Sequence, residues 1–197
     1  MATYLPPVER PRNVALKLMY FFTRRQFGKV MTPLAVFSAR MPLAFTSFYG
    51  KVSRLDKKLE VPEATAVLIR EQVASINTCH FCMDAARWQA LRTSSENEER
   101  FDALPRYRTS PLFTDAERAA LDYATELTAD RQVTPETFDR LARHYSERQI
   151  CNIVWLVASE HLYNMSNIGL NIGSDGLCEL GTDRAPSAPA TAPSLTA

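Results

Sequence analysis

The sequence predicts an all-α fold, and three observations favour it. Apolar residues recur at spacings of three and four along most of the chain. No stretch alternates apolar and polar residues as a half-buried strand would, and only 6 glycines interrupt 197 residues. Hydrophobic residues make up 46% of the chain and charged residues 23%, as is ordinary for a globular domain. We therefore expect one domain of about seven to eight helices.

Composition divides the chain into three parts. Residues 1–12 are rich in proline and are expected to be extended. Residues 182–197 consist mostly of Pro, Ala, Ser and Thr, with too few apolar side chains to form a core, so we expect a disordered tail. The helical domain is therefore expected over residues 13–181.

Proline, glycine and charged residues separate the helices of the first half. We expect a helix boundary at Met41, because the residue before a proline is disfavoured in a helix. Pro62 suits the first turn of a helix, where its missing N–H has no partner to lose. Asn77 and Thr78 interrupt the apolar spacing and end that helix. The expected helices span residues 13–27, 34–41, 43–55, 63–76 and 79–91.

Helix starts are clearer in the second half. Ser94 or Ser95 is expected to cap a short charged helix over residues 96–104. Thr114-Asp115-Ala116-Glu117 and Ser146-Glu147-Arg148-Gln149 both have the capping-box pattern, and Thr134-Pro135 is an N-cap followed by proline at the first helical position. The second capping box opens the longest apolar helix, expected over residues 150–165.

Charge is distributed unevenly. Residues 1–58 contain 11 Lys and Arg against 2 acids, a balance of +9, so the remainder carries −8 and the whole chain +1. An anionic partner or membrane surface would explain this asymmetry, but we favour packing of the basic part on the acidic remainder, within one subunit or between subunits. We expect no nucleic-acid partner, because no such motif is present. We also expect no membrane span, because no apolar run approaches about 18 residues.

The first 50 residues are unusually aromatic. This aromatic cluster is predicted to lie in the core or at a subunit interface rather than to bind a cofactor. Its members are Tyr20, Phe21, Phe22, Phe27, Phe37, Phe45, Phe48 and Tyr49.

Four cysteines in a chain of this length do not form a disulfide framework. Three prolines and Glu9 interrupt the first dozen residues, so no secretory signal is recognisable and we expect a cytoplasmic, reducing location. Paired cysteines in such a compartment indicate redox or metal chemistry.

Cys79-His80-Phe81-Cys82 is the motif that carries chemistry. Two intervening residues allow both sulfurs to approach bonding distance across one helical turn. The unpaired N–H groups and positive dipole at a helix start stabilise a thiolate, which is the form that attacks peroxides and disulfides. His80 is a candidate to add positive charge or to carry a proton.

Other interpretations of the pair stay open. A zinc site would need two further ligands, from Cys151, Cys178 or a histidine. Thioredoxin-type chemistry expects a βαβ context, which this helical pattern lacks. Two buried, inert cysteines are also possible, and Cys151 itself is expected at a buried apolar position.

Residues 70–84, in which an apolar helix ends in Ile76-Asn77-Thr78-Cys79 and continues to Cys82, resemble the carboxymuconolactone decarboxylase/AhpD-like alkylhydroperoxidase superfamily. Residues 113–121 and 150–164 resemble family segments too, and the resemblance covers roughly residues 20–180. It implies an all-helical AhpD-like domain and a homo-oligomer, usually a trimer or hexamer. It also implies peroxide reduction without a bound cofactor, in which Cys82 attacks, Cys79 resolves, and an external protein or small thiol reduces the disulfide.

Two positions depart from the family pattern. Peroxidase members usually carry a histidine four residues after the second cysteine, where this chain has Ala86, and a glutamate twelve residues before the first, where it has Val67. Glu71, His80 and His161 are the candidates to replace these relay groups. Further polar residues that could reach the dithiol are Asp84, Arg87, Glu160 and Asn164.

The sequence therefore predicts a thiol-dependent oxidoreductase that uses Cys79 and Cys82, with hydroperoxide reduction as its candidate reaction. A non-catalytic or redox-sensing oligomer on the same scaffold is the alternative, because both relay groups are missing. Lactone decarboxylation is a third possibility, which the dithiol disfavours because decarboxylating members of the family generally lack it.

Overall fold

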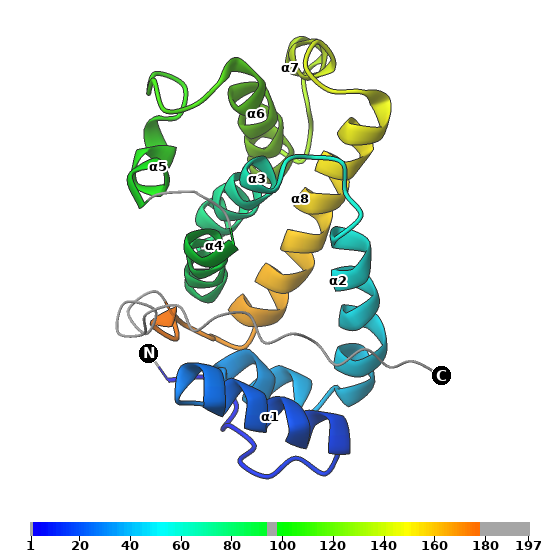
Figure 1. Cartoon of the computed structure of the whole chain (residues 1–197), viewed down its shortest axis with the longest axis vertical. Helices are drawn as coiled ribbons and strands as arrows, with labels where there is room; N and C mark the ends of the chain where they lie inside the picture. The colour runs from blue at the N-terminus through cyan, green and yellow to red at the C-terminus, as the bar shows by residue number, and fades with distance from the viewer. Residues whose placement is uncertain (1, 94–97, 178–197) are drawn as a thin grey trace.

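The computed structural model describes residues 2–93 and 98–177, and all regular structure within them is helical. The predicted fold class is thus confirmed. Three helices form the centre: α3 (Glu63–Ile76), α6 (Asp115–Ala129) and α8 (Glu147–Ile168) (Figure 1). A fourth, α4 (His80–Thr93), follows α3 after a short turn and packs against it. The remaining elements are α1 (Val14–Phe27), η1 (Leu34–Ser38), η2 (Ala44–Tyr49), α2 (Gly50–Asp56), α5 (Glu98–Ala103), η3 (Leu104–Arg106) and α7 (Pro135–Ala142).

Some sequence predictions lie outside the described residues. They concern the caps at Ser94 and Ser95, Cys178, and the tail over residues 182–197.

Local capping fixes where the helices begin. The Asn13 side chain accepts the Leu16 N–H at 3.2 Å and starts α1. Both predicted capping boxes are present, at Thr114 before α6 and at Ser146 before α8. Because Ser146 is itself the cap, α8 begins at Glu147, three residues before the predicted start.

Residues 34–49 differ from the regular helices expected there. The segments η1 and η2 are π-helical turns, and the Ala39 N–H donates to the Leu34 carbonyl five residues back at 3.1 Å. Pro42 contributes no N–H that could continue a regular ladder between them. Such wide turns occur often at functional sites, and both segments lie beside the cleft described below.

Two apolar clusters hold the centre together. The larger one joins α3, α6 and α8 through residues such as Ile69, Ala120 and Ile153, all fully buried. The other surrounds the two cysteines and brings Phe27 and Val36, from the N-terminal segment, against them. Packing of α1 and η1 therefore forms one wall around the dithiol.

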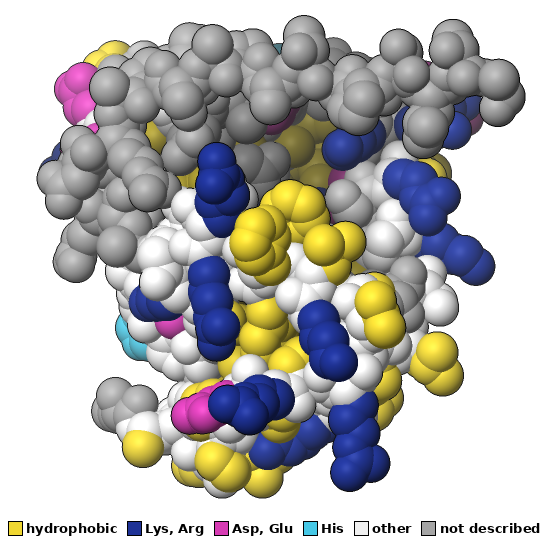
Figure 2. Space-filling view, turned by 60° about the horizontal axis from the view of Figure 1, so that its bottom comes forward, with side chains coloured by type: hydrophobic (Ala, Val, Ile, Leu, Met, Phe, Trp, Pro, Cys, Tyr) yellow, Lys and Arg dark blue, Asp and Glu magenta, His cyan; other side chains and the backbone are white. Residues whose placement is uncertain are grey.

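Helix α1 is apolar on opposite faces. Leu16 and Tyr20 pack inward, whereas Val14 is 77% and Phe21 60% exposed. Figure 2 shows hydrophobic side chains interspersed with Lys and Arg on the side of the molecule that carries α1. The aromatic cluster is thus partly core, with Tyr20 and Phe27 buried, and partly surface of the single chain. Within residues 2–93 and 98–177, no helix has the length and apolarity to span a membrane.

Candidate functional site

The turn between α3 and α4 positions the dithiol. Thr78 adopts a left-handed backbone with φ of 57°, which reverses the chain directly after α3. The Cys79 N–H then donates to the Ala74 carbonyl at 2.9 Å, and the Cys79 carbonyl accepts the Met83 N–H at 3.0 Å. Cys79 therefore stands immediately before α4 and Cys82 in its first turn, where free N–H groups favour a thiolate.

Cys79 and Cys82 form a disulfide, with Cα atoms 5.3 Å apart. Both side chains are buried: Cys79 is 1% exposed and Cys82 6%. Helix α4 begins at the predicted place, and the two thiols are close enough to react with each other.

A large cleft opens onto one of the two cysteines. Its volume is about 1160 Å³, and Cys82 contributes to its lining whereas Cys79 does not. Most of the wall is apolar, from α1, η1, α3, α4 and α8; it includes Leu18, Met19, Leu34, Phe37, Val67, Phe81, Ala86 and Leu156. Arg70, Glu160 and Tyr163 provide a polar region. A molecule in the cleft thus meets Cys82 first.

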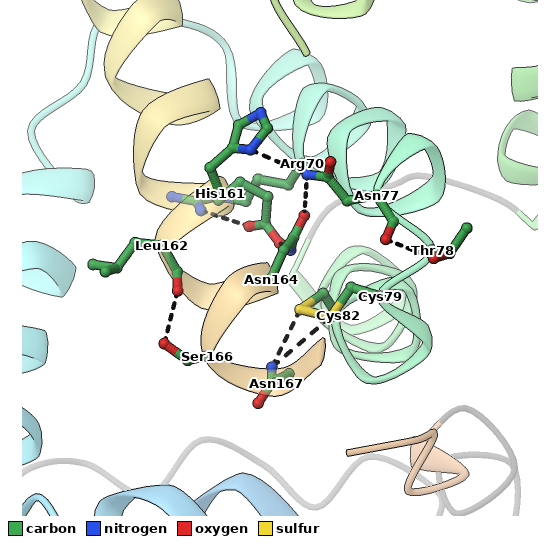
Figure 3. Close-up of a disulfide and its surroundings, with 11 residues drawn as sticks. Arg70, Asn77, Thr78, Cys79, Cys82, His161, Leu162, Asn164, Ser166 and Asn167 are labelled. Carbon is green, nitrogen blue, oxygen red and sulfur yellow. Dashed lines mark hydrogen bonds and ion pairs between the residues drawn. A yellow bond between two sulfur atoms is a disulfide. The ribbon is translucent and has the colours of Figure 1, made fainter. Parts of the chain in front are cut away.

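Asn167 is the side chain that contacts both sulfurs. Its Nδ2 lies 3.3 Å from Cys82 Sγ and 3.9 Å from Cys79 Sγ (Figure 3). The residue is buried near the end of α8 and also lines the cleft. Asn167 was not among the predicted site residues. One feature of the sequence could have indicated it: Asn164 and Asn167 lie one turn apart, so two amides share one face of a largely apolar helix.

A polar network crosses between α3 and α8 above the sulfurs. Asn77 donates to Asn164 Oδ1 at 2.8 Å, and Asn164 donates to Glu160 Oε1 at 2.7 Å (Figure 3). Arg70 pairs with Glu160 at 3.1 Å and with Asp56 at 2.9 Å. Burial raises the pKa of Glu160, while Arg70 opposes that rise. Glu160 and Asn164 therefore take part in contacts that join α3 to α8.

His161 joins this network from its outer side. Its Nδ1 lies 3.3 Å from Asn77 Nδ2, and its Nε2 lies 3.4 Å from Arg131 Nη1. Partial burial, and then the charge of Arg131, lower the pKa of the imidazole. His161 therefore faces the asparagine network and connects to the dithiol only through other side chains.

Glu71 is almost fully buried between α3 and α4. Its Oε1 accepts a hydrogen bond of 3.3 Å from Arg87 Nε. Burial raises the pKa of Glu71 to about 7, although Arg87 acts in the opposite direction. A carboxyl group with this pKa can exchange a proton at neutral pH.

Three other candidates are placed differently. His80 is exposed, while both sulfurs are buried. Asp84 bonds to Ser174 Oγ and accepts the Gly176 N–H at 2.9 Å, so it holds the segment after α8 against α4. Cys151 is exposed, so its predicted burial is wrong: it occupies the outward face of α8. Among the described residues, no three His, Cys, Asp or Glu side chains are grouped to hold a metal ion.

Comparison with known proteins places this architecture. No family model matches the chain. The uncharacterized protein YnjA of Escherichia coli is 30% identical over 189 residues, covering 91% of this chain and 98% of that protein. An uncharacterized peroxidase-related protein from Ralstonia eutropha, described as an alkylhydroperoxidase AhpD core, superposes with a TM-score of 0.68 at 20% identity, over 89% of this chain and 94% of that one. The chain belongs to the same family as YnjA, and its fold is AhpD-like.

A debrominase of similar fold is also among the solved structures. Bmp8, solved as a Cys→Ala variant in complex with 2,3,4-tribromopyrrole, has a TM-score of 0.75 at 22% identity, over 93% of this chain and 97% of its own.

The two positions where AhpD-like peroxidases usually carry their relay groups are filled by an apolar cluster. Val67 and Ala86 are buried and pack with Ala90 and Phe101. Val67 and Ala86 also line the cleft together with Cys82. Apolar side chains thus occupy both positions. Glu71, one turn after Val67, and Arg87, next to Ala86, pair with each other.

Proposed function

We propose that this protein is a thiol-dependent oxidoreductase that reduces organic hydroperoxides through Cys82 and Cys79. One observation carries the proposal: Cys79 and Cys82 form a buried pair, and Cys82, but not Cys79, lines a large apolar cleft. Lactone decarboxylation is not favoured, because the cleft is lined by Cys82 and not by Glu71 or His161.

The proposed reaction has two steps. The Cys82 thiolate attacks the distal oxygen of ROOH: an S–O bond forms, the O–O bond breaks, and the alkoxide takes a proton to leave as ROH. Cys79 then attacks the sulfenic sulfur of Cys82, the S–S bond forms, and hydroxide leaves as water after gaining a proton. An external dithiol returns two electrons and two protons. Glu71, with a pKa near neutrality, is our candidate to supply protons near the site.

The cleft supports an organic substrate over hydrogen peroxide. A volume of about 1160 Å³ is far more than a molecule the size of water needs. Its apolar wall stabilises hydrocarbon through burial, by roughly 25 cal/mol per Å² of apolar surface removed from water.

Peroxide consumption tests the proposal. The reduced protein is mixed with cumene hydroperoxide and excess dithiothreitol, and peroxide loss is followed over time. We expect turnover by the wild type, loss in Cys82→Ser and Cys79→Ser, and retention in Cys151→Ser, which removes an exposed cysteine outside the pair. Equal rates in wild type and Cys82→Ser would refute a peroxidase and favour a redox-sensing or non-catalytic protein.

Reductive removal of halogen is a second candidate. The fold similarity to the debrominase Bmp8, which was solved with 2,3,4-tribromopyrrole, and the apolar cleft beside Cys82 favour it. Two thiols would supply two electrons: carbon–bromine becomes carbon–hydrogen, bromide leaves, and the disulfide forms. Bromide release from 2,3,4-tribromopyrrole by the reduced protein, with Cys82→Ser as control, tests it.

We also propose a homo-oligomer, a trimer or hexamer, supported by the exposed apolar face of α1. Val14, Leu18, Phe21 and Phe22 lie there, on a helix whose opposite face is already buried. Light scattering of the wild type and of Phe21→Glu tests it, since a charge on this face should dissociate the assembly. We further propose a reducing, cytoplasmic location and an external thiol as the electron donor.

A further inference from the structure

Asn167 is fixed in place by the end of α8. Its carbonyl accepts the N–H groups of Leu170 at 3.2 Å and Ile172 at 2.9 Å, in a turn that Asn171 permits with φ of 53°. The side chain is therefore aimed from a rigid position, with Nδ2 directed at the two sulfurs (Figure 3). Asn167 is 5% exposed, so little water competes for this contact.

The charged groups on the surrounding elements are engaged with other partners. On α3, Arg70 pairs with Asp56 and Glu160. Glu71 of α3 pairs with Arg87 of α4.

Further groups on α4, α8 and the nearby loops also have partners. Asp84 bonds to Ser174 and Gly176, His161 faces Asn77 and Arg131, and Lys29 pairs with Asp175. His80 is exposed. Among the described residues, the side-chain hydrogen bonds to the sulfurs come from Asn167.

We propose that Asn167 is a catalytic residue of the thiol chemistry, whose amide N–H donates to negative sulfur. This inference rests on the proposed function. In the disulfide the amide nitrogen lies 3.3 Å from Cys82 Sγ. In the reduced protein the same N–H donates to the Cys82 thiolate before that sulfur attacks the distal peroxide oxygen. In the second step it is within reach of the Cys79 thiolate as that sulfur attacks the Cys82 sulfenic sulfur and hydroxide leaves.

An amide is suited to this role because it does not titrate, so its N–H donor is present at every pH of the experiment. A hydrogen bond to the charged form favours that form and lowers the pKa of the thiol. Loss of a hydrogen bond to a charged group should raise the Cys82 pKa by about one to two units. Below that pKa, the rate of thiolate reactions should fall about tenfold for each unit.

The test is the pH profile of Cys82 alkylation in the full-length reduced protein. Iodoacetamide is the probe, and modification of the Cys82 peptide is followed by mass spectrometry, so no peroxide is needed. We compare wild type with Asn167→Ala and with Asn167→Asp, which keeps the shape but loses the donor. Asn152→Ala is the matched control: it removes an asparagine of the same helix whose Oδ1 accepts the Glu60 N–H at 2.8 Å.

We expect the Cys82 pKa to rise by about one unit or more in Asn167→Ala and further in Asn167→Asp, where a carboxylate would face the thiolate. Asn152→Ala should leave it unchanged. Should Asn167→Ala fail to fold, the isosteric aspartate variant decides the question. A folded Asn167 variant with the wild-type pKa would overturn the inference, whether or not the protein reduces peroxides. A shifted pKa without peroxide turnover would keep the role of Asn167 and refute only the proposed function.

Discussion

Glu71 and Arg87 share one hydrogen bond, 3.3 Å between Oε1 and Nε, while the second carboxylate oxygen of Glu71 has no partner among the described residues. The Arg87 guanidinium pairs with two carboxylates, because it also donates to Asp102 at 3.1 Å. Glu71 is 2% exposed, so one half-buried guanidinium does not offset the loss of water. This is why its pKa rises to about 7.

Glu71→Gln should therefore change how stability depends on pH. Below about pH 4.5 the carboxyl is protonated in both the folded and unfolded chains; from there to about pH 7 the folded chain holds a proton that the unfolded chain has released. The wild type should lose about 2–3 kcal/mol of unfolding free energy as pH rises through this window. The glutamine variant should lose much less. Urea unfolding at a series of pH values measures both.

Glu63→Gln is the control for this experiment. Glu63 lies in the first turn of the same helix and is exposed. Its replacement should leave the pH dependence as in the wild type. Parallel pH profiles for wild type and Glu71→Gln would contradict the raised pKa.

Arg70→Met should destabilise the protein strongly. Arg70 is the shared partner of Asp56 and Glu160, and Asp56 also accepts the Trp155 indole N–H at 2.8 Å. Removing Arg70 leaves two carboxylates with low exposure uncompensated, which should cost about 3 kcal/mol of unfolding free energy at neutral pH. Denaturant unfolding measures the loss.

A surface ion pair provides the comparison. Arg148 pairs with Glu60 at 2.7 Å, but their side chains are 72% and 50% exposed. Arg148→Ala should cost less than about 1 kcal/mol. Similar losses in the two variants would mean that the Asp56–Arg70–Glu160 network contributes no more than an exposed pair.

Helix starts were predictable because their causes are local. Thr114 and Ser146 satisfy N–H groups three residues away, so four consecutive residues suffice to recognise them. The π turns at Leu34–Ser38 and Ala44–Tyr49 were not, because their side-chain spacing resembles that of a regular helix over so few residues. Exposure of Cys151 was also missed, since α8 is apolar on more than one face.

The same division holds for the site. The Cys79–Cys82 pair was predictable from spacing and from the helix start, both local properties. Asn167 was not, because its contact with Cys82 spans 85 residues and depends on how α8 crosses α4. Arg70 was missed for a related reason: Glu160 lies 90 residues away in the chain. Capping and motif patterns cannot specify such long-range partners.

His161→Leu should have little effect on thiol reactivity. The imidazole contacts Asn77 and Arg131, and it reaches the sulfurs only through further side chains. Residues without a shared partner usually act independently, so the rate of Cys82 alkylation at neutral pH should stay within about threefold of the wild type. A larger drop would show that His161 takes part in the chemistry.

Restoring the relay groups should increase peroxidase activity. Val67 and Ala86 line the cleft beside Cys82, and Ala86 lies one turn beyond it on α4. The double variant Val67→Glu, Ala86→His places an acid and a base there. Since positioned acid–base groups contribute about 10²–10⁴ in rate, we expect kcat/KM for cumene hydroperoxide to rise at least about tenfold. The added bulk and polarity should cost about 1–3 kcal/mol of stability.

Ala90→His is the control for that gain. Ala90 belongs to the same apolar cluster as Val67 and Ala86 but does not line the cleft. A histidine there should bring the loss of stability without the gain in kcat/KM. Because the Glu and His of the double variant would act as a pair, each single replacement should gain less than the double one. A folded double variant with wild-type kcat/KM would mean that the missing relay does not limit the reaction, and that Glu71 or another group already supplies the protons.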